Sequence, residues 1–174
     1  MTVGIVYRVP GLGAVLGCDS RVTDEHGEIM TDSDEKWLVA GSAVACCAGA
    51  LGGLGVDLRA TPPRNWPELR KALTMTDAVD RGLDYEALVY DRRGDALFWS
   101  DHQGDALRRG LYATLGSGGA TALGALDASA PPKTLEAAER LVRRALRITC
   151  KRHSACGGRL RVLVVPRRGT IRVG

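Results

Sequence analysis

The sequence predicts an α+β fold in which two stacked antiparallel sheets carry helices on both outer faces. Two observations support this prediction. Short apolar runs recur in pairs with turn residues between them, which is typical of β-hairpins. These pairs alternate along the chain with two groups of helical segments. The whole chain, residues 1–174, is expected to form one domain.

The N-terminal part contains two predicted hairpins. Residues 2–9 and 14–19 are apolar runs on either side of a Pro-Gly-Leu-Gly turn. An acidic loop follows over residues 23–35. Residues 37–40 and 44–48 form the second pair, which is apolar on both faces, so we expect it to be covered on both sides.

The strongest helix pattern begins after Thr134, a residue type that caps helix N-termini, and places six apolar residues on one stripe. Three other helical segments are expected: a short one rich in small residues, one that begins at Pro67, and one after a Gly-Ser-Gly-Gly turn. The helices are predicted over residues 49–59, 68–79, 120–128 and 134–151. The remaining strands are predicted over residues 86–90, 96–100, 112–115, 160–165 and 171–173.

The composition, 45% hydrophobic and 25% charged, is typical of a soluble globular protein. No apolar run approaches the roughly 20 residues that a membrane-spanning helix needs, and no secretory signal is recognised. The five cysteines include no Cys-x-x-Cys pair and no zinc-type spacing, which favours free thiols in a reducing compartment. A cytoplasmic location without a metal or other cofactor is therefore expected.

Charge is divided unevenly along the chain. Residues 1–132 carry 12 Lys/Arg and 18 Asp/Glu, whereas residues 133–174 carry 12 and 2. A basic C-terminal part can indicate nucleic-acid binding. However, aromatic residues make up 5% and do not interleave with the arginines, so a surface that faces solvent or another subunit is favoured.

The predicted chemistry centres on Thr2. A threonine at the chain terminus, here after removal of Met1, carries its own base, because its α-amine lies within reach of its hydroxyl. Asp19 ends the strand paired with the one that bears Thr2, and Lys36 follows the acidic loop. Lys36 is expected to pair with Asp19 and to lie beside the hydroxyl, where an ammonium favours the ionised nucleophile and stabilises charge during attack. An ordinary surface ion pair is the alternative.

These residues carry a resemblance to a known family. Thr2, the Gly-Cys-Asp-Ser-Arg-Val-Thr segment at 17–23 and Lys36 resemble the catalytic half of proteasome β subunits and their bacterial HslV-type relatives. Three later segments resemble that family's Ala-Gly, Gly-Ser-Gly and Ser-Gly-Gly turns. They are Ala48-Gly49-Ala50, residues 115–119 and Cys156-Gly157-Gly158. The resemblance implies a four-layer αββα N-terminal nucleophile hydrolase fold, with one helical layer shortened between Gly49 and Tyr85.

The resemblance also implies roles for single residues. Thr2 is the implied nucleophile, with Asp19 and Lys36 as its charge-tuning partners. The Gly49 backbone N–H is the implied oxyanion donor, and Ser117 is expected to hydrogen-bond near the amine.

Substrate is expected to bind as an extended strand against Thr23 and Gly49. Four residues are expected to line the pocket for its side chain, among which Asp34 favours a basic or polar group. They are Val22, Asp34, Cys47 and Leu51.

The implied activity is that of a threonine endopeptidase subunit in a self-compartmentalising homo-oligomeric ring or double ring. Its substrate is unfolded polypeptide, and an ATP-dependent unfoldase encoded separately is the implied partner. Three alternatives stay open: a catalytically inactive ring subunit, a non-proteolytic amidase of the same fold, and a nucleic-acid-binding protein. The inactive alternative is supported by His153 and Cys156, which stand where the family has a second aspartate and its adjoining serine.

Overall fold

The computed structural model describes residues 2–23, 26, 28–32, 36–49, 64–65, 67–69, 71, 85–101 and 104–174. Its strands are β1 (Gly4–Val9), β2 (Gly13–Cys18), β3 (Val22–Thr23), β4 (Ile29–Thr31), β5 (Trp37–Ala40), β6 (Ala43–Gly49), β7 (Tyr85–Asp91), β8 (Ala96–Asp101), β9 (Gly104–Arg108), β10 (Tyr112–Leu115), β11 (Arg161–Pro166) and β12 (Arg172–Val173). Its helices are α4 (Gly119–Asp127) and α5 (Leu135–Arg152), and residues 67–69 and 71 are also helical.

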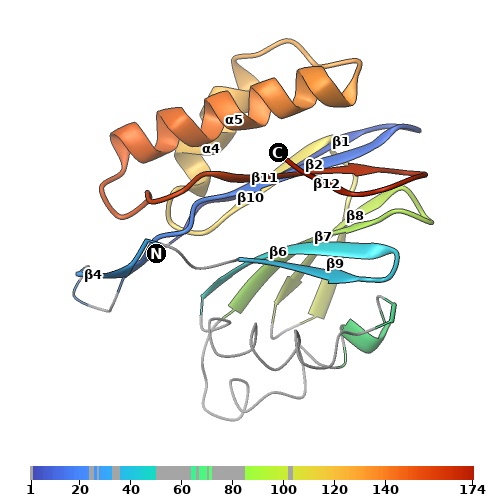
Figure 1. Ribbon diagram of the computed structural model, residues 1–174, viewed down its shortest axis with the longest axis horizontal. Helices are drawn as coiled ribbons and strands as arrows, with labels where there is room; N and C mark the ends of the chain where they lie inside the picture. Colours follow the sequence, from blue (N-terminus) through green and yellow to red (C-terminus); the bar gives the residue numbers. More distant parts are fainter. Residues whose placement is uncertain are drawn as a thin grey trace.

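Two five-stranded antiparallel sheets form the centre of the molecule. The first has the order β10-β1-β2-β11-β12 and the second the order β5-β6-β7-β8-β9, while β3 and β4 form a separate short hairpin. Figure 1 shows the two sheets face to face, with α4 and α5 across the outer face of the first. The chain is therefore mixed α/β with stacked antiparallel sheets, as predicted.

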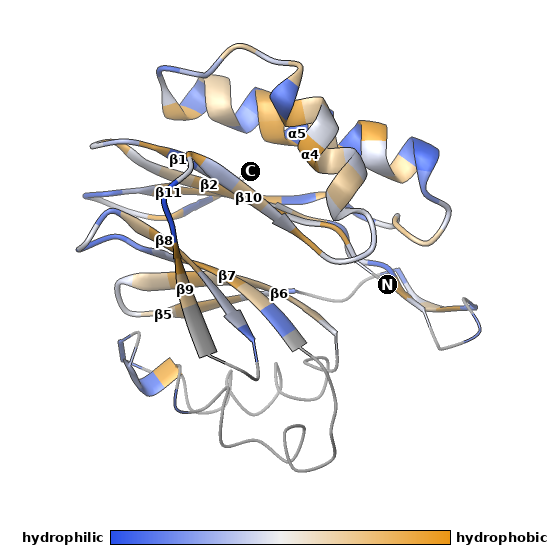
Figure 2. Ribbon diagram, turned by 180° about the vertical axis from the view of Figure 1, so that it is seen from behind, coloured by the Kyte–Doolittle hydropathy of each residue, from blue (hydrophilic) through white to orange (hydrophobic). Residues whose placement is uncertain are grey.

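The space between the sheets is filled by apolar side chains from both. Alternate residues of β1 and β2 meet alternate residues of β6 and β7 there, as the two-residue period of a strand requires. Figure 2 shows that the strands of both sheets are largely apolar. The buried members of this inter-sheet core are Val6, Ala14, Leu16, Cys18, Val44, Cys46, Ala48, Leu88, Tyr90, Leu97, Leu115, Leu163 and Val165.

Helix α5 covers the first sheet because its sequence is amphipathic and well capped. Thr134 has extended backbone angles, and its hydroxyl accepts a hydrogen bond from the backbone N–H of Ala137 at 3.2 Å. Val142 and Leu146 are fully buried against β2, where a Cβ at Gly17 would lie 2.5 Å from Val142 Cγ1. Glycine at position 17 therefore lets the helix approach the sheet closely.

The second sheet also buries its outer face. Leu69, from the described helical residues 67–69 and 71, is fully buried with residues of β5, β6 and β7. These helical residues lie on the side of the second sheet away from α5 (Figure 1). The rest of the predicted second helical layer, including the segments at 49–59 and 68–79, falls mostly on residues outside the described part of the chain.

The predicted hairpins are confirmed, and two further features appear. The pairs β1–β2, β5–β6, β7–β8 and β11–β12 are antiparallel with the expected turns. Strand β9 was not predicted, and the loop predicted over 23–35 overlaps the short β3–β4 hairpin. Among the described helices, none is both long enough and apolar enough to cross a membrane.

The N-cap of α5 can be tested by substitution. Thr134→Ala removes the side-chain acceptor for Ala137 N–H, so we expect a loss of about 1 kcal/mol in the free energy of unfolding and about 2–4 °C in Tm. Thr170→Ala, at an exposed position outside any helix or strand, serves as the control and should change Tm by less than a degree or so. Equal melting temperatures for the two variants would contradict the assigned cap.

Candidate active site

Thr2, Asp19 and Lys36 meet at one end of the inter-sheet space. The ammonium of Lys36 lies 2.9 Å from Thr2 Oγ1 and 2.9 Å from Asp19 Oδ1, and it also donates to the backbone carbonyl of Arg21. Thr2 is 6% exposed, Asp19 0% and Lys36 8%. An ammonium has three N–H donors, so three acceptors around it give Lys36 a fixed orientation toward the Thr2 hydroxyl.

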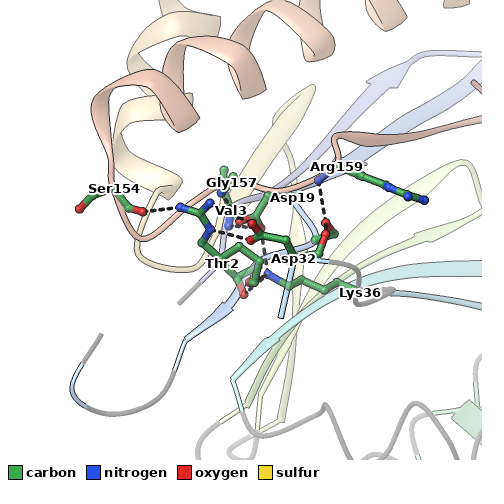
Figure 3. A network of polar contacts seen from close by, with 10 residues as sticks. Thr2, Val3, Asp19, Asp32, Lys36, Ser154, Gly157 and Arg159 are labelled. Atoms are coloured by element: carbon green, nitrogen blue, oxygen red, sulfur yellow. Dashed lines mark hydrogen bonds and ion pairs between the residues drawn. The ribbon is translucent and has the colours of Figure 1, made fainter. Parts of the chain in front are cut away.

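The carboxylate of Asp19 is held by backbone groups as well as by Lys36. Its Oδ1 accepts from Val3 N–H at 3.1 Å, and its Oδ2 accepts from Gly157 N–H at 2.9 Å. A carboxylate without solvent is stable only when paired and hydrogen-bonded. Asp19 is thus a buried anion whose position is set by the residue before β1, by Lys36 and by the loop after α5. Figure 3 shows these groups converging on it.

The turn at residues 116–118 packs against Thr2 from another side. Gly118 N–H donates to the Thr2 carbonyl at 3.2 Å. Gly116 has a φ of +76°, and a Cβ built on it would lie 2.3 Å from the same carbonyl oxygen. Glycine at position 116 therefore meets two requirements, since it takes a left-handed conformation and leaves space for Thr2.

A polar network secures the loops beside the site. Arg21 pairs with Asp32 through two contacts of 2.7 and 3.1 Å, and it donates to the Ser154 carbonyl at 2.9 Å. The hydrogen bond from Arg21 lowers the pKa of Asp32. Ser20 Oγ donates to the Asp32 carbonyl and accepts from Arg159 N–H at 2.8 Å. These contacts, drawn in Figure 3, join the β3–β4 hairpin to the chain after α5.

Four of the other predicted site residues, all within the described part of the chain, differ in exposure. Gly49 is the last residue of β6, is exposed and has a φ of +86°. Val22 and Thr23 are half-buried in β3. Cys47 is 5% exposed in the core on the outer face of the second sheet, and its N–H donates to the Lys36 carbonyl at 2.9 Å.

Two residues of the predicted substrate pocket, Asp34 and Leu51, lie outside the described residues.

Ser117 is exposed at the tip of the 116–118 turn. Burial is the main cause that raises the pKa of the Cys156 thiol, and Ser117 acts in the opposite direction. Cys156 is 1% exposed, and its N–H donates to the His153 carbonyl at 3.0 Å. The position where the resembling family has a serine is therefore filled here by a buried, protonated thiol.

Sequence reasoning did not identify the backbone groups that hold Asp19 and Lys36. The Val3 and Gly157 N–H groups and the Arg21 carbonyl leave no trace in residue identity, because any residue supplies them. Gly157 did appear in a resembling turn, but without a role. Within the described part of the chain, no group of three or more His, Cys, Asp or Glu is placed to hold a metal ion.

In a comparison with models of known protein families, residues 82–165 match the model named Proteasome, which is described as proteasome subunit. This match covers β7 to β11 and includes the turn that packs on Thr2. It does not reach Thr2, Asp19 or Lys36, so the geometry of these three residues is an independent observation. A comparison with curated proteins gives no match.

Because Gly116 packs against Thr2, we expect alanine to cost more stability at position 116 than at position 169. Gly116→Ala and Gly169→Ala both place a side chain at a positive φ, of +76° and +95°, but the added Cβ meets Thr2 only at position 116 and nothing within 4 Å at position 169. Gly169→Ala should cost about 1–2 kcal/mol from the backbone alone, and Gly116→Ala about 1–3 kcal/mol more. Urea unfolding of both variants measures the difference, and equal losses would contradict the contact.

The buried thiols give a second prediction. Burial raises the pKa of Cys47 to about 12, and the hydrogen bond with Cys46, together with burial, raises the pKa of Cys18. Both therefore stay protonated at pH 8 and are shielded from reagents. We expect a disulfide reagent such as DTNB to modify neither in native protein and all five thiols in 6 M guanidinium. Rapid labelling of Cys47 before unfolding, located by peptide mass, would overturn its assignment to the core.

Proposed function

We propose that this chain is a proteasome-type subunit, a threonine-type endopeptidase that uses Thr2 as its nucleophile after removal of Met1. The single observation that carries the proposal is the contact of Lys36 Nζ with both Thr2 Oγ1 and Asp19 Oδ1 at 2.9 Å. All three side chains are buried. A surface ion pair would not place a threonine hydroxyl on the same ammonium.

The proposed reaction combines these Lys36 contacts with the free amine of Thr2 and the N–H of Gly49. The Thr2 hydroxyl gives its proton to the free α-amine of the same residue as its oxygen attacks the substrate carbonyl. The ammonium of Lys36 stabilises the negative charge that develops on the attacking oxygen, because both lie in a site with little solvent. The tetrahedral oxyanion accepts a hydrogen bond from Gly49 N–H. The C–N bond then breaks, the amine leaves with a proton, and water hydrolyses the ester on Thr2.

Substrate binding is proposed as strand addition. Thr23 in β3 is half-buried and Gly49 at the end of β6 is exposed, so both are accessible to a peptide. An extended peptide between them would be held mainly by backbone hydrogen bonds, while pockets select alternate side chains. Val22, Asp34, Cys47 and Leu51 are proposed for the pocket nearest the scissile bond, where the buried Cys47 would form part of an apolar floor.

Assembly completes the proposal. Proteins of the proteasome subunit family act as subunits of oligomeric rings on polypeptides. We propose a homo-oligomeric ring or double ring in the cytoplasm that encloses the sites, with unfolded polypeptide supplied by a separately encoded ATP-dependent unfoldase. No nucleic acid is needed for this function.

A catalytically inactive ring subunit is the second candidate, and a non-proteolytic amidase with the same Thr2 chemistry is the third. The inactive candidate is favoured by His153 and Cys156, which stand where the resembling family has an aspartate and a serine. The intact Lys36–Asp19 pair argues against it.

Degradation of an unfolded polypeptide tests the proposal. We expect assembled wild-type protein to degrade reduced casein, and Thr2→Ala to lower the rate on the order of a thousandfold or more, because it removes the hydroxyl that contacts Lys36 Nζ. Thr170→Ala, an exposed threonine, is the matched control and should keep the wild-type rate. A Thr2→Ala variant that assembles and degrades casein as fast as wild type would refute Thr2 as the nucleophile. Cleavage of short amide substrates without casein degradation would favour the amidase.

A further inference from the structure

Glu86 is an acidic residue on the inward face of the second sheet. Along β7, Ala87 and Val89 belong to the outer core of that sheet, whereas Leu88 and Tyr90 belong to the inter-sheet core. By the two-residue period of a strand, Glu86 shares the inward face with Leu88 and Tyr90. It lies directly opposite Ala48 of β6, one residue before Gly49.

The carboxylate of Glu86 reaches the first sheet. Its Oε2 accepts the backbone N–H of Gly116 at 3.1 Å, in a partly buried contact. Gly116 begins the turn that packs on Thr2, and a Cβ built on it would lie 3.3 Å from Thr2 Cβ. Glu86, on the second sheet, therefore contacts the turn, and the turn contacts Thr2. A hydrogen bond to an ionised acceptor is stronger than one between neutral groups.

Glu86 has a second acidic residue as its neighbour within its own sheet. Asp101 of β8 lies directly opposite it on the same face. Like charges directly opposite in an antiparallel pair destabilise the pair. The partner that the structure gives the Glu86 carboxylate is the Gly116 N–H of the opposite sheet's turn. Local rules that a sequence breaks in this way commonly mark functional positions.

We propose that Glu86 is a positioning residue for Thr2, which holds the 116–118 turn against the nucleophile from the opposite sheet. This inference rests on the proposed function, because it assigns Glu86 to the reaction at Thr2. Glu86 acts through the turn and does not touch Thr2 itself. It also links the turn to the end of β6, so that Gly49 and Thr2 keep a constant separation.

The test compares Glu86→Ala, which removes the acceptor, with Glu86→Gln, whose amide oxygen can still accept from Gly116 N–H. Asp101→Ala is the control. It removes the carboxylate that lies opposite Glu86 in the sheet, and it leaves the hydrogen bond between Glu86 and Gly116 in place. For assembled protein and a fluorogenic peptide, we expect Glu86→Ala to lower kcat about tenfold to a hundredfold at an unchanged KM, and Glu86→Gln to restore most of the rate. Asp101→Ala should keep the wild-type kcat.

Hydrogen exchange of the peptide that contains residues 115–119 gives a readout that does not depend on activity. Glu86→Ala should speed exchange there, with Glu86→Gln close to wild type, while Tm is similar in both. If Glu86→Ala keeps the wild-type kcat and the wild-type exchange, the inference about Glu86 is wrong, while the proposed function is unaffected. A wild-type protein without peptidase activity, whose exchange still responds to Glu86→Ala, would overturn the proposed function and with it the catalytic purpose of Glu86, but not its contact with the turn.

Discussion

The structure of the site depends on a lysine ammonium held without much solvent beside an aspartate and a threonine hydroxyl. Transfer of such an ion pair from water into a protein is costly, and the attraction between the charges offsets this only when other hydrogen bonds complete the shell. Here Asp19 accepts from Val3 and Gly157 N–H as well as from Lys36. Removal of any of these contacts would leave a buried charge incompletely paired, which explains why separate parts of the chain converge at this point.

The fold supplies each contact from a different element. The chain before β1 brings Thr2, the end of β2 brings Asp19, and the start of β5 brings Lys36. The loop after α5 adds Gly157, and the turn between β10 and α4 closes over Thr2. Because α5 packs closely on β2 at Gly17, the helix that carries this loop is fixed relative to Asp19. The packing of the first sheet is thus what places the nucleophile.

Sequence patterns predicted the elements whose determinants are local. The Thr134 cap and the apolar stripe gave α5 nearly to its ends, and the turn residues gave the hairpins. Strand β9 was missed because it is an edge strand, with Leu107 and Arg108 exposed, so it carries little apolar alternation. The buried face of α5 was predicted less accurately, since the predicted stripe omitted Leu146 and Thr149, which are buried. The stripe consisted of Leu135, Ala138, Leu141, Val142, Ala145 and Ile148.

Within the site, too, some residues were predicted from the sequence and others were not. Thr2, Asp19 and Lys36 were predicted because their side chains carry the chemistry, whereas Gly157 and Glu86 were not assigned roles. The role of Gly157 lies in its backbone N–H, and that of Glu86 in a contact between sheets that no sequence spacing reveals. The family match over residues 82–165 and the geometry of the three residues near the N-terminus thus support the proposed function independently of each other.

The intact mass of the purified protein, before and after incubation with an epoxyketone directed at N-terminal threonines, tests the central claim most directly. We predict a mass without Met1, followed by a single adduct on Thr2 that does not form in Thr2→Ala. Retention of Met1 and no adduct, in protein that has assembled, would contradict Thr2 as the nucleophile.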